Sequence, residues 1–228
     1  MIIGNGLIAS LFKGESVAEV VFFASGVSNS LETDKTQFQR EENLLRKNIK
    51  ESPNKLFLYF STCSIYDSSK AESPYVLHKL KMEQVVAETC SRYLVLRLSN
   101  VVGKGGNPNL LMNYLVNSVK RGDVINVHTK ATRNLIDAED VKAVVFNLLK
   151  QKQFNRVVNL AYIDNYTIIE ILEILESVIK LKPNLNLIKV GVGYPISISS
   201  EVENYFIENS LNNKYLYLKN ILSKYYLS

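Results

Sequence analysis

Apolar runs of strand length alternate with longer stretches of helical periodicity along the first part of the chain. Val20–Ala24 and Leu56–Phe60 are continuously apolar, and Tyr93–Leu98 is largely so, whereas Thr36–Ile49 and the segment after Pro74 carry apolar residues at helical spacing. Strands buried on both faces have this character, and their alternation with helices is typical of parallel sheets. The sequence therefore predicts an α/β fold with a doubly wound parallel sheet and right-handed crossovers.

The same patterns predict further elements in the second half of the chain. They are a helix over 110–120, a strand at Val124–Val127, a helix at Asp140–Leu149, a strand at Val157–Leu160 and a helix at Thr167–Ile179, which Thr167 and Glu170 open with a capping box. Residues 104–109 are rich in Gly, Asn and Pro, which indicates a boundary between two regions of the fold.

The composition is that of a folded chain with a full apolar core. Of 228 residues, 46% are hydrophobic and 21% charged, which is unlike a disordered segment. The apolar runs fall well short of the roughly 20 residues that a membrane-spanning helix needs. Met1–Phe12 has no preceding cation and is broken by Gly4 and Gly6, unlike a signal peptide. We therefore expect a cytoplasmic protein with no membrane partner.

Charge and cysteine usage narrow the classes of ligand. The net charge is +5, but the longest basic stretch around Lys120–Arg121 is only a pair, so we expect no nucleic-acid partner. A polyanionic small molecule is sufficient to account for the excess. Cys63 and Cys90 lack CxxC spacing, and the chain has only two histidines. We therefore predict no metal site and two reduced thiols.

A glycine-containing turn follows the first β-prone residues, Met1–Ile3. Gly4, Gly6 and Ala9 form a GxGxxA pattern that runs into residues at helical spacing. Such a turn lets the backbone approach a pyrophosphate because glycine has no Cβ, and the helix N-terminus presents unpaired N–H groups to the anion. The pattern alone fits a purely structural turn equally well, but its place after the first strand favours a dinucleotide site.

Hydroxyl side chains at Ser61–Ser64 follow a predicted strand, and Tyr75 and Lys79 lie on the next helix. Their spacing of four puts Tyr75 and Lys79 on one helix face. A nearby ammonium favours the phenolate form of a phenol whose free pKa is about 10, so Tyr75 could serve as acid or base. Thr62 would hydrogen-bond the same substrate oxygen and orient a carbonyl for hydride transfer. Each pattern alone also occurs by chance.

Six segments, taken in chain order, carry a resemblance to a known family. They are the glycine motif at Gly4, Gly6 and Ala9, then Phe23–Gly26, Tyr59–Tyr66, Ser73–Lys79 with Glu83, Leu96–Gly103 and Arg133–Val141. Together they resemble the extended short-chain dehydrogenase/reductase family, which contains nucleotide-sugar epimerases, dehydratases and reductases, in an unusually short form. The match extends to about Leu175, and chance agreement of six motifs in order is improbable.

The resemblance implies a Rossmann-like sheet, NAD or NADP as cofactor, a nucleotide-sugar substrate, a role in surface polysaccharide synthesis and a homodimer. It implies Thr62, Tyr75 and Lys79 as catalytic residues. The implied cofactor contacts are Gly4, Asn5, Gly6, Leu7, Ile8, Ala24, Ser25, Gly26, Ser61, Tyr75, Lys79 and Leu98. The implied substrate contacts are Ser64, Asn100, Asn109 and Arg133.

The chain also departs from the family pattern. Between the glycine turn and Val20–Ala24 there is room for only one helix, so the second and third strands of the family are absent if Val20–Ala24 is its fourth strand. The distance from this run to Thr62 favours that assignment over the second strand. No acid lies around Phe23–Gly26 to hold a ribose hydroxyl. We expect a narrowed sheet, an incomplete adenosine site and weak cofactor binding. The sequence does not distinguish NAD from NADP, because the strand that discriminates between them is absent.

The departures also bear on the reaction. Dehydratases of the family carry an Asp-Glu pair where this chain has Cys63-Ser64, which disfavours sugar dehydration. We expect a truncated dinucleotide-binding core with the catalytic residues at 1–103, and the remaining core elements with a small substrate-binding region at 104–228. The predicted activity is reduction of a 4-keto nucleotide-sugar. The alternatives are a 4-epimerase that retains NAD and a non-catalytic relative that binds a sugar nucleotide or a partner through the tyrosine-rich tail, Tyr205–Tyr226.

Overall fold

The computed structural model describes residues 1–15, 17–105, 107 and 110–227. The chain divides into two compact units, of which the first comprises Met1–Leu98 and Ala138–Leu160 and the second comprises Ser99–Asp137 and Ala161–Ser228. The chain thus returns to the first unit after leaving it at Leu98, so the core elements expected beyond Lys104 are a helix and a strand within Ala138–Leu160.

The first unit contains a five-stranded parallel sheet. Its strands are β1 (Ile2–Ile3), β2 (Val20–Phe23), β3 (Leu56–Thr62), β4 (Tyr93–Leu98) and β8 (Arg156–Leu160), in the spatial order β1-β2-β3-β4-β8. Every residue of β2 and β3 is buried, which explains why both strands are continuously apolar apart from the hydroxyl residues at the end of β3. The α/β class and the parallel sheet predicted from the sequence are confirmed.

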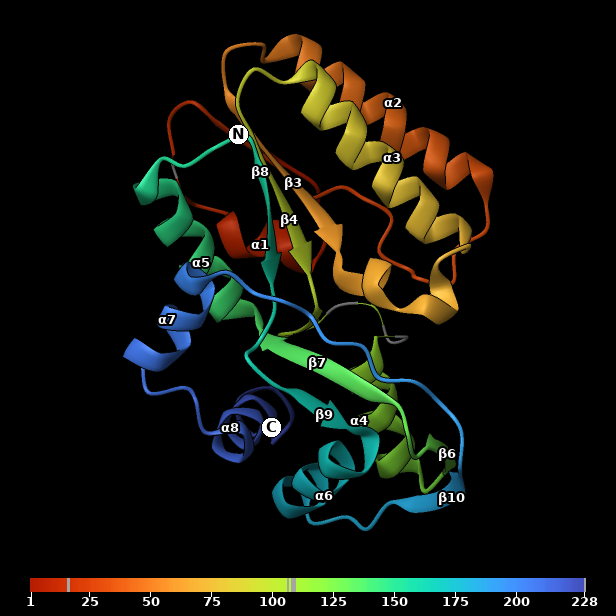
Figure 1. Cartoon of the computed structure of the whole chain (residues 1–228). Coiled ribbons are helices and arrows are strands. Elements are labelled where there is room, and N and C mark those ends of the chain that lie inside the picture. The colour runs from red at the N-terminus through yellow and green to blue at the C-terminus, as the bar shows by residue number, and fades with distance from the viewer. Residues whose placement is uncertain (16, 106, 108–109, 228) are drawn as a thin grey trace. The chain divides into compact units, whose positions relative to one another are not determined.

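Helices cover both faces of this sheet. They are α1 (Leu7–Phe12), α2 (Lys35–Glu51), α3 (Pro74–Thr89) and α5 (Ala138–Gln151). Figure 1 shows α2 and α3 running side by side beside β3 and β4. Side chains on alternate positions of the strands, such as Phe23 and Tyr59, pack with Leu45 of α2 and Met82 of α3. The other face carries α1 and α5, because Phe12 of α1 stacks on Phe22 and Phe60 and also meets Phe146 of α5.

The first crossover has the opposite hand to the two that follow it. The strands β1, β2, β3 and β4 step across the sheet in one direction, but α1 lies on one face whereas α2 and α3 lie on the other. About 98% of parallel crossovers are right-handed, so a sheet that mixes the two hands is unusual; α5, which leads into β8, also lies on the α1 face. Our expectation of right-handed crossovers throughout was therefore wrong. The hand of the β1–α1–β2 connection is the one expected when the second and third strands are absent from a doubly wound sheet. In that case α1 stays on its face of the sheet, and the chain passes from it directly to the strand on the other side of β1.

Strand β1 forms an edge of the sheet. Among the described residues, β2 is the only strand paired with it. In doubly wound dinucleotide folds the second and third strands lie beyond the first, and the acid that holds the adenosine ribose follows the second. The edge position of β1 confirms the narrowed sheet predicted from the short interval between the glycine turn and Val20.

The described residues of the second unit form short strands and four helices. Its strands are β5 (Asn100–Val102), β6 (Val124–His128), β7 (Thr132–Asp137), β9 (Asn165–Thr167) and β10 (Asn184–Ile188), and its helices are α4 (Leu111–Arg121), α6 (Ile168–Ile179), α7 (Ser200–Glu208) and α8 (Lys214–Tyr226). One sheet has the order β5-β7-β9 and another pairs β10 with β6. The predicted capping box of Thr167 and Glu170 is present at the start of α6.

The tyrosine-rich tail is part of the second unit's core. Tyr217 of α8 is buried and stacks on Tyr162 with ring centroids 4.0 Å apart, and Phe206 of α7 packs edge-on against both rings. The Tyr217 hydroxyl also accepts a hydrogen bond from Asp137 N of β7 at 2.9 Å. The tail therefore has a packing role, which its composition alone did not indicate.

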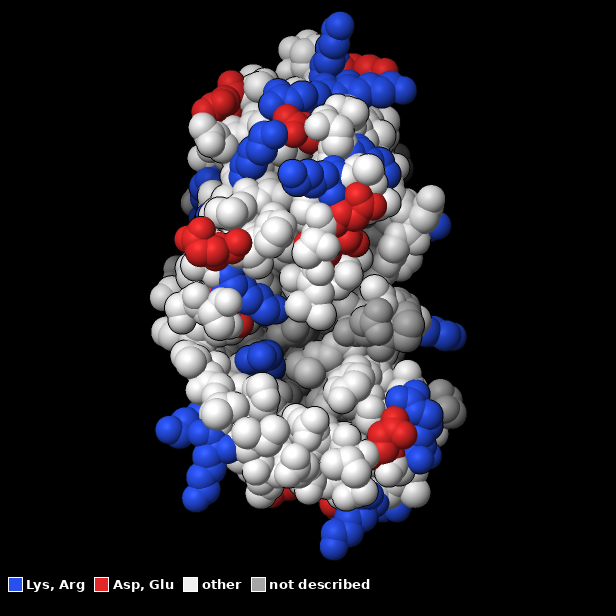
Figure 2. Space-filling model, turned by 90° about the vertical axis from the view of Figure 1, so that its right-hand side faces the viewer, with Lys and Arg blue, Asp and Glu red and all other residues white. Residues whose placement is uncertain are grey.

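Charge is mixed over the surface that Figure 2 presents. Lys and Arg side chains are interspersed with Asp and Glu on this face instead of forming one continuous basic tract. None of the helices in the described ranges has the length and apolar composition that crossing a bilayer requires.

Candidate functional site

The glycine turn between β1 and α1 lies against the end of β2. Gly4 has φ +127°, and a Cβ built on it would lie 2.3 Å from the carbonyl oxygen of Ala24. Only glycine fits this close approach without strain. Gly6 is the N-cap of α1 in extended conformation, and both Asn5 and Gly6 are exposed, so the backbone of the turn is open to a ligand.

The loop after β2 covers a buried polar cluster. Ala24, Ser25 and Gly26 are partly exposed, and a Cβ on Gly26 would lie 2.4 Å from Lys79 Nζ and 2.9 Å from Glu41 Oε1. Glycine at this position lets the predicted cofactor loop lie directly on the side chain of Lys79. The structure therefore brings the loop and the lysine of the sequence-predicted site into contact.

The end of β3 positions two predicted site residues. Thr62 caps the short 3-10 helix η1 (Cys63–Tyr66), because its Oγ1 accepts a hydrogen bond from Ser64 N at 3.0 Å. Thr62 is buried, and Ser64 is half-buried. Ser61 points to the α3 side and donates from its Oγ to Glu83 Oε1 at 2.5 Å.

Tyr75 begins the first turn of α3. The helix starts at Pro74, and the Oγ of Ser73 accepts from Val76 N, which is the combination favoured at helix N-termini. The ring of Tyr75 is buried with Val27 and Val76. No hydrogen bond joins its hydroxyl to the described residues, which leaves that group available to a ligand.

Lys79 is buried and its ammonium is fully engaged. Its side chain is 3% exposed. Its Nζ lies 3.1 Å from Glu41 Oε1, 3.2 Å from the hydroxyl of Tyr59 and 3.5 Å from the carbonyl oxygen of Phe60. An ammonium has three N–H donors, so these three acceptors account for all of them.

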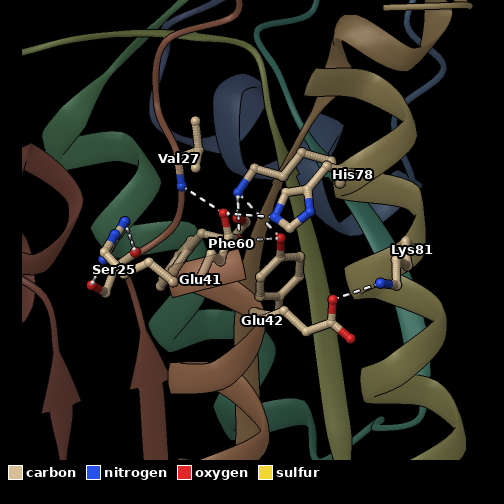
Figure 3. Close-up of polar contacts among 10 residues, drawn as sticks. Ser25, Val27, Glu41, Glu42, Phe60, His78 and Lys81 are labelled. Atoms are coloured by element: carbon tan, nitrogen blue, oxygen red, sulfur yellow. Dashed lines mark hydrogen bonds and ion pairs between the residues drawn. The ribbon is translucent and has the colours of Figure 1, made fainter. Parts of the chain in front are cut away.

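Glu41, from α2, is the centre of this cluster (Figure 3). It is fully buried and accepts from Val27 N at 2.6 Å and from the Tyr59 hydroxyl at 2.7 Å, and His78 Nε2 lies 3.2 Å from its Oε2. Burial alone would raise the pKa of Glu41, but the Lys79 ammonium and these hydrogen bonds together hold that pKa well below its usual range. Burial, followed by the Glu41 carboxylate, raises the pKa of Tyr59 well above its ordinary value, which keeps Tyr59 protonated.

A second network lies at the ends of β3, β4 and β8. Arg97 of β4 makes a two-pronged contact with Glu83 of α3, with Nη2 at 2.6 Å from Oε2 and Nε at 3.0 Å from Oε1. Its Nη1 donates to the Tyr66 hydroxyl at 3.1 Å, and Tyr66 in turn bonds Asn159 of β8. Burial opposes the charge of Arg97, but Glu83 and Tyr66 raise its pKa above the ordinary value. This network supports the strand ends from which Ser61 projects.

The remaining predicted residues divide between the units. Leu98 is buried at the end of β4 in the first unit. Asn100 and Arg133 belong to the second unit, where they lie on the adjacent strands β5 and β7. Asn100 Nδ2 donates to the Asn134 carbonyl at 2.8 Å, and Arg133 Nη1 donates to the Thr132 carbonyl at 2.7 Å. Asn109 lies outside the described residues.

Sequence reasoning missed Glu41 and Tyr59. Glu41 falls at helical spacing between Phe38 and Leu45, on the side of α2 that faces the sheet. A carboxylate in line with apolar residues is a signal of a buried charge that needs a cationic partner. Tyr59 carried no such signal, because an aromatic residue in a buried strand reads as core packing.

The described residues of the first unit have features that fit a dinucleotide, and one feature, the engaged Lys79 ammonium, that opposes a contact with its ribose. The close-packed turn at Gly4, the exposed backbone at Gly6 and the unpaired Tyr75 hydroxyl fit a pyrophosphate and a reacting oxygen. The Lys79 ammonium would have to give up an acceptor in order to hold a ribose hydroxyl. Within the described ranges no three His, Cys, Asp or Glu side chains gather as metal ligands would, and Cys63 and Cys90 are free thiols.

Comparison with known proteins identifies relatives of this chain. A model of the NAD dependent epimerase/dehydratase family matches residues 4–161. No curated protein matches the sequence.

Among solved structures, the chain is similar to the UDP-N-acetylglucosamine 4-epimerase from Methanobrevibacter ruminantium M1 in complex with UDP-N-acetylmuramic acid, with TM-score 0.72, 18% identity and coverage of 98% of this chain and 82% of that one. The chain is also similar to RMD from Pseudomonas aeruginosa complexed with NADPH, with TM-score 0.69, 17% identity and coverage of 96% of this chain and 86% of that one. A third similar structure is the UDP-glucuronic acid 4-epimerase from Bacillus cereus in complex with UDP-glucuronic acid and NAD, with TM-score 0.66, 18% identity and coverage of 96% of this chain and 79% of that one. At these identities the similarity concerns the fold.

Proposed function

Because this chain belongs to the NAD-dependent epimerase/dehydratase family, we propose that it reduces a 4-keto nucleotide-sugar with an exchangeable nicotinamide dinucleotide. Family membership confirms the resemblance on which the expected enzyme class rested. The similar structures include one with NADPH, one with NAD and a sugar nucleotide, and one with UDP-N-acetylmuramic acid. These ligands support the proposed substrate class and leave the choice between NADH and NADPH to experiment.

The proposed chemistry uses hydroxyl groups of the first unit. A reduced nicotinamide, when bound, supplies a hydride to the carbonyl carbon of the substrate. The Tyr75 hydroxyl, which makes no hydrogen bond to a described residue, donates its proton to the carbonyl oxygen as that oxygen gains negative charge. Thr62 polarises the carbonyl through its own hydroxyl. The backbone of Gly4–Ile8 and the loop Ala24–Gly26, with Leu98 and Ser61, are the proposed cofactor contacts.

The observation that carries this proposal is the edge position of β1. No described strand lies beyond β1 to provide the acid that holds the adenosine ribose, so the dinucleotide would rely on its pyrophosphate and nicotinamide halves. Because the Lys79 ammonium already has protein acceptors, the nicotinamide ribose would contribute less to cofactor affinity. Weak retention suits a reductase, which exchanges its cofactor in each cycle.

Ser64 of the first unit and Asn100 and Arg133 of the second are offered as contacts to the sugar and its diphosphate, with Asn109. A guanidinium suits a diphosphate because it can donate two parallel hydrogen bonds. We also propose that the enzyme is located in the cytoplasm, forms a homodimer and takes part in surface polysaccharide synthesis.

The decisive experiment combines turnover with binding. The chain is assayed with NADH and NADPH against a panel of 4-keto nucleotide-sugars by loss of reduced-nicotinamide absorbance. Tyr75→Phe should lower turnover by about 100-fold or more while NADH affinity stays within about twofold. Tyr215→Phe, at an exposed tyrosine of α8, is the matched control and should keep full turnover. Equal turnover of Tyr75→Phe and the wild type would refute the assignment of Tyr75.

A 4-epimerase that retains NAD is the second candidate. It would use the same hydroxyls but needs the dinucleotide to remain bound through an oxidation and a reduction. Stoichiometric NAD in the supernatant of the denatured, purified protein would favour this reaction over the reductase. Absence of turnover with every substrate and of any dinucleotide binding would instead favour the non-catalytic relative.

A further inference from the structure

The Lys79 ammonium and the Glu41 carboxylate form a pair that is closed on all sides. Lys79 gives its three N–H groups to Glu41, Tyr59 and Phe60, and Gly26 lies directly against its Nζ. Both side chains of the pair are almost completely buried. A ligand ribose therefore competes with acceptors that the fold already provides, and the strongest of these is the charged carboxylate.

Glu41 also connects the three elements that carry the proposed site. Its carboxylate accepts from Val27 at the end of the cofactor loop, from Tyr59 of β3 and from Lys79 of α3. His78 Nε2 also lies 3.2 Å from Glu41 Oε2. The low pKa of Glu41 keeps it ionised at neutral pH, so it balances the charge of Lys79 at that pH.

We propose that Glu41 is a positioning residue that holds the Lys79 ammonium away from the dinucleotide and so weakens cofactor binding. This inference rests on the proposed dinucleotide-dependent function and deepens it, because it names a residue that sets how readily the cofactor exchanges. In this arrangement the lysine serves mainly to join α3 to α2 and β3. Its charge reaches the cofactor only after compensation by Glu41.

Replacing the carboxylate with an amide tests this directly. In Glu41→Gln the amide oxygen is a weaker, neutral acceptor, so a ribose hydroxyl can compete for one Lys79 N–H, and the uncompensated ammonium attracts the diphosphate. A hydrogen bond from a charged donor corresponds to about a tenfold change in affinity. We therefore expect NADH to bind Glu41→Gln about tenfold more tightly than the wild type, although the variant is less stable.

Glu42→Gln provides the matched control. Glu42 is the next residue of α2 and pairs with Lys81 of α3, so it joins the same two helices, but the Lys81 side chain is 57% exposed, in contrast to the buried Lys79 (Figure 3). The substitution makes the same change of charge one residue away from the cluster. NADH affinity of Glu42→Gln should stay within about twofold of the wild type, because Lys79 keeps its contacts with Glu41, Tyr59 and Phe60.

Tyr59→Phe tests the inference in a variant that keeps the buried ion pair. It removes the hydroxyl that accepts from Lys79 and donates to Glu41, and it leaves the ring in the core. One N–H of Lys79 then lacks an acceptor, and we expect about threefold tighter NADH binding, the effect of a neutral hydrogen bond. This variant carries the test if Glu41→Gln does not fold.

The readouts are NADH titration by fluorescence and the thermal midpoint of each full-length variant. Tighter binding together with a lower midpoint supports the proposal, because a purely structural role would make binding weaker or leave it unchanged. Equal or weaker binding by both folded variants, with measurable binding by the wild type, overturns the role of Glu41 and leaves the proposed function standing. If neither NADH nor NADPH binds the wild type or the variants at millimolar concentration, the proposed function fails and this inference fails with it.

Discussion

The contact between Glu83 and Arg97 should be one of the most costly polar interactions to disrupt in the first unit. Arg97 reaches Glu83 through Nη2 at 2.6 Å and Nε at 3.0 Å, and Ser61 donates to the same carboxylate at 2.5 Å. The side chains of Glu83 and Arg97 are only 8% and 19% exposed. Glu83→Gln keeps the shape of the side chain but leaves the guanidinium without a counter-charge.

The expected cost follows from this burial. Removing one partner of a buried ion pair costs about 3–5 kcal/mol of unfolding free energy, because the remaining charge is left uncompensated. Arg97 retains its bond to Tyr66 and some contact with water, and the glutamine oxygen still accepts, so we expect the low end, about 3 kcal/mol. Replacing both charges by methionine, in Glu83→Met with Arg97→Met, should cost less than Glu83→Gln alone, since no charge is then buried.

Urea unfolding followed by circular dichroism gives the comparison. The wild type, Glu83→Met, Arg97→Met and the double variant form a cycle from which the coupling between the two residues is obtained, and Glu83→Gln is measured beside them. A loss below about 1 kcal/mol for Glu83→Gln would show that the pair behaves as a surface ion pair. A double variant whose loss equals the sum of the single losses would likewise refute the argument.

Three further predictions address the glycine turn, the buried carboxylate and the thiols. Gly4→Ala puts a methyl 2.3 Å from the Ala24 carbonyl at φ +127°, so we expect a loss of about 2–4 kcal/mol and weaker NADH binding; an unchanged thermal midpoint would contradict the close packing. Because the folded pKa of Glu41 lies below its ordinary 4.5, its contribution to stability is present above about pH 4.5 and is lost as the pH falls further; Glu41→Gln should therefore show a flatter acid-unfolding curve, and parallel curves would argue against this. Burial raises the pKa of the Cys63 thiol well above its usual range and that of Cys90 to about 11, so both should react slowly with a disulfide reagent at pH 8 until urea is added, and rapid labelling of native Cys63 would contradict its burial.

Local patterns predicted most of the first unit's elements. Burial on both faces leaves a continuous apolar run, as at Leu56–Phe60, and a helix packed on a sheet leaves an apolar stripe. The absence of two strands was also readable, because the interval between Gly6 and Val20 holds only one helix. The family resemblance followed from ordered motifs and needed no three-dimensional information.

The environment of the candidate site was less accessible from the sequence. Helical spacing put Tyr75 and Lys79 on one face of α3, and the structure keeps both in that helix. The spacing could not show that a carboxylate 38 positions earlier in the chain pairs with Lys79. Pairing of buried charges depends on which elements pack together, and neither residue's neighbours in the sequence contain that information.

The sequence by itself determined where strands and helices form and that the turn at Gly4 needs glycine, because these follow from periodicity and backbone sterics within a few residues. Only the tertiary structure decided the opposite hand of the first crossover and the partner of Lys79. The crossover takes its hand from the face on which α1 packs, and the lysine takes its partner from the helix that lies against α3. Both are outcomes of packing between distant segments, which local sequence does not specify.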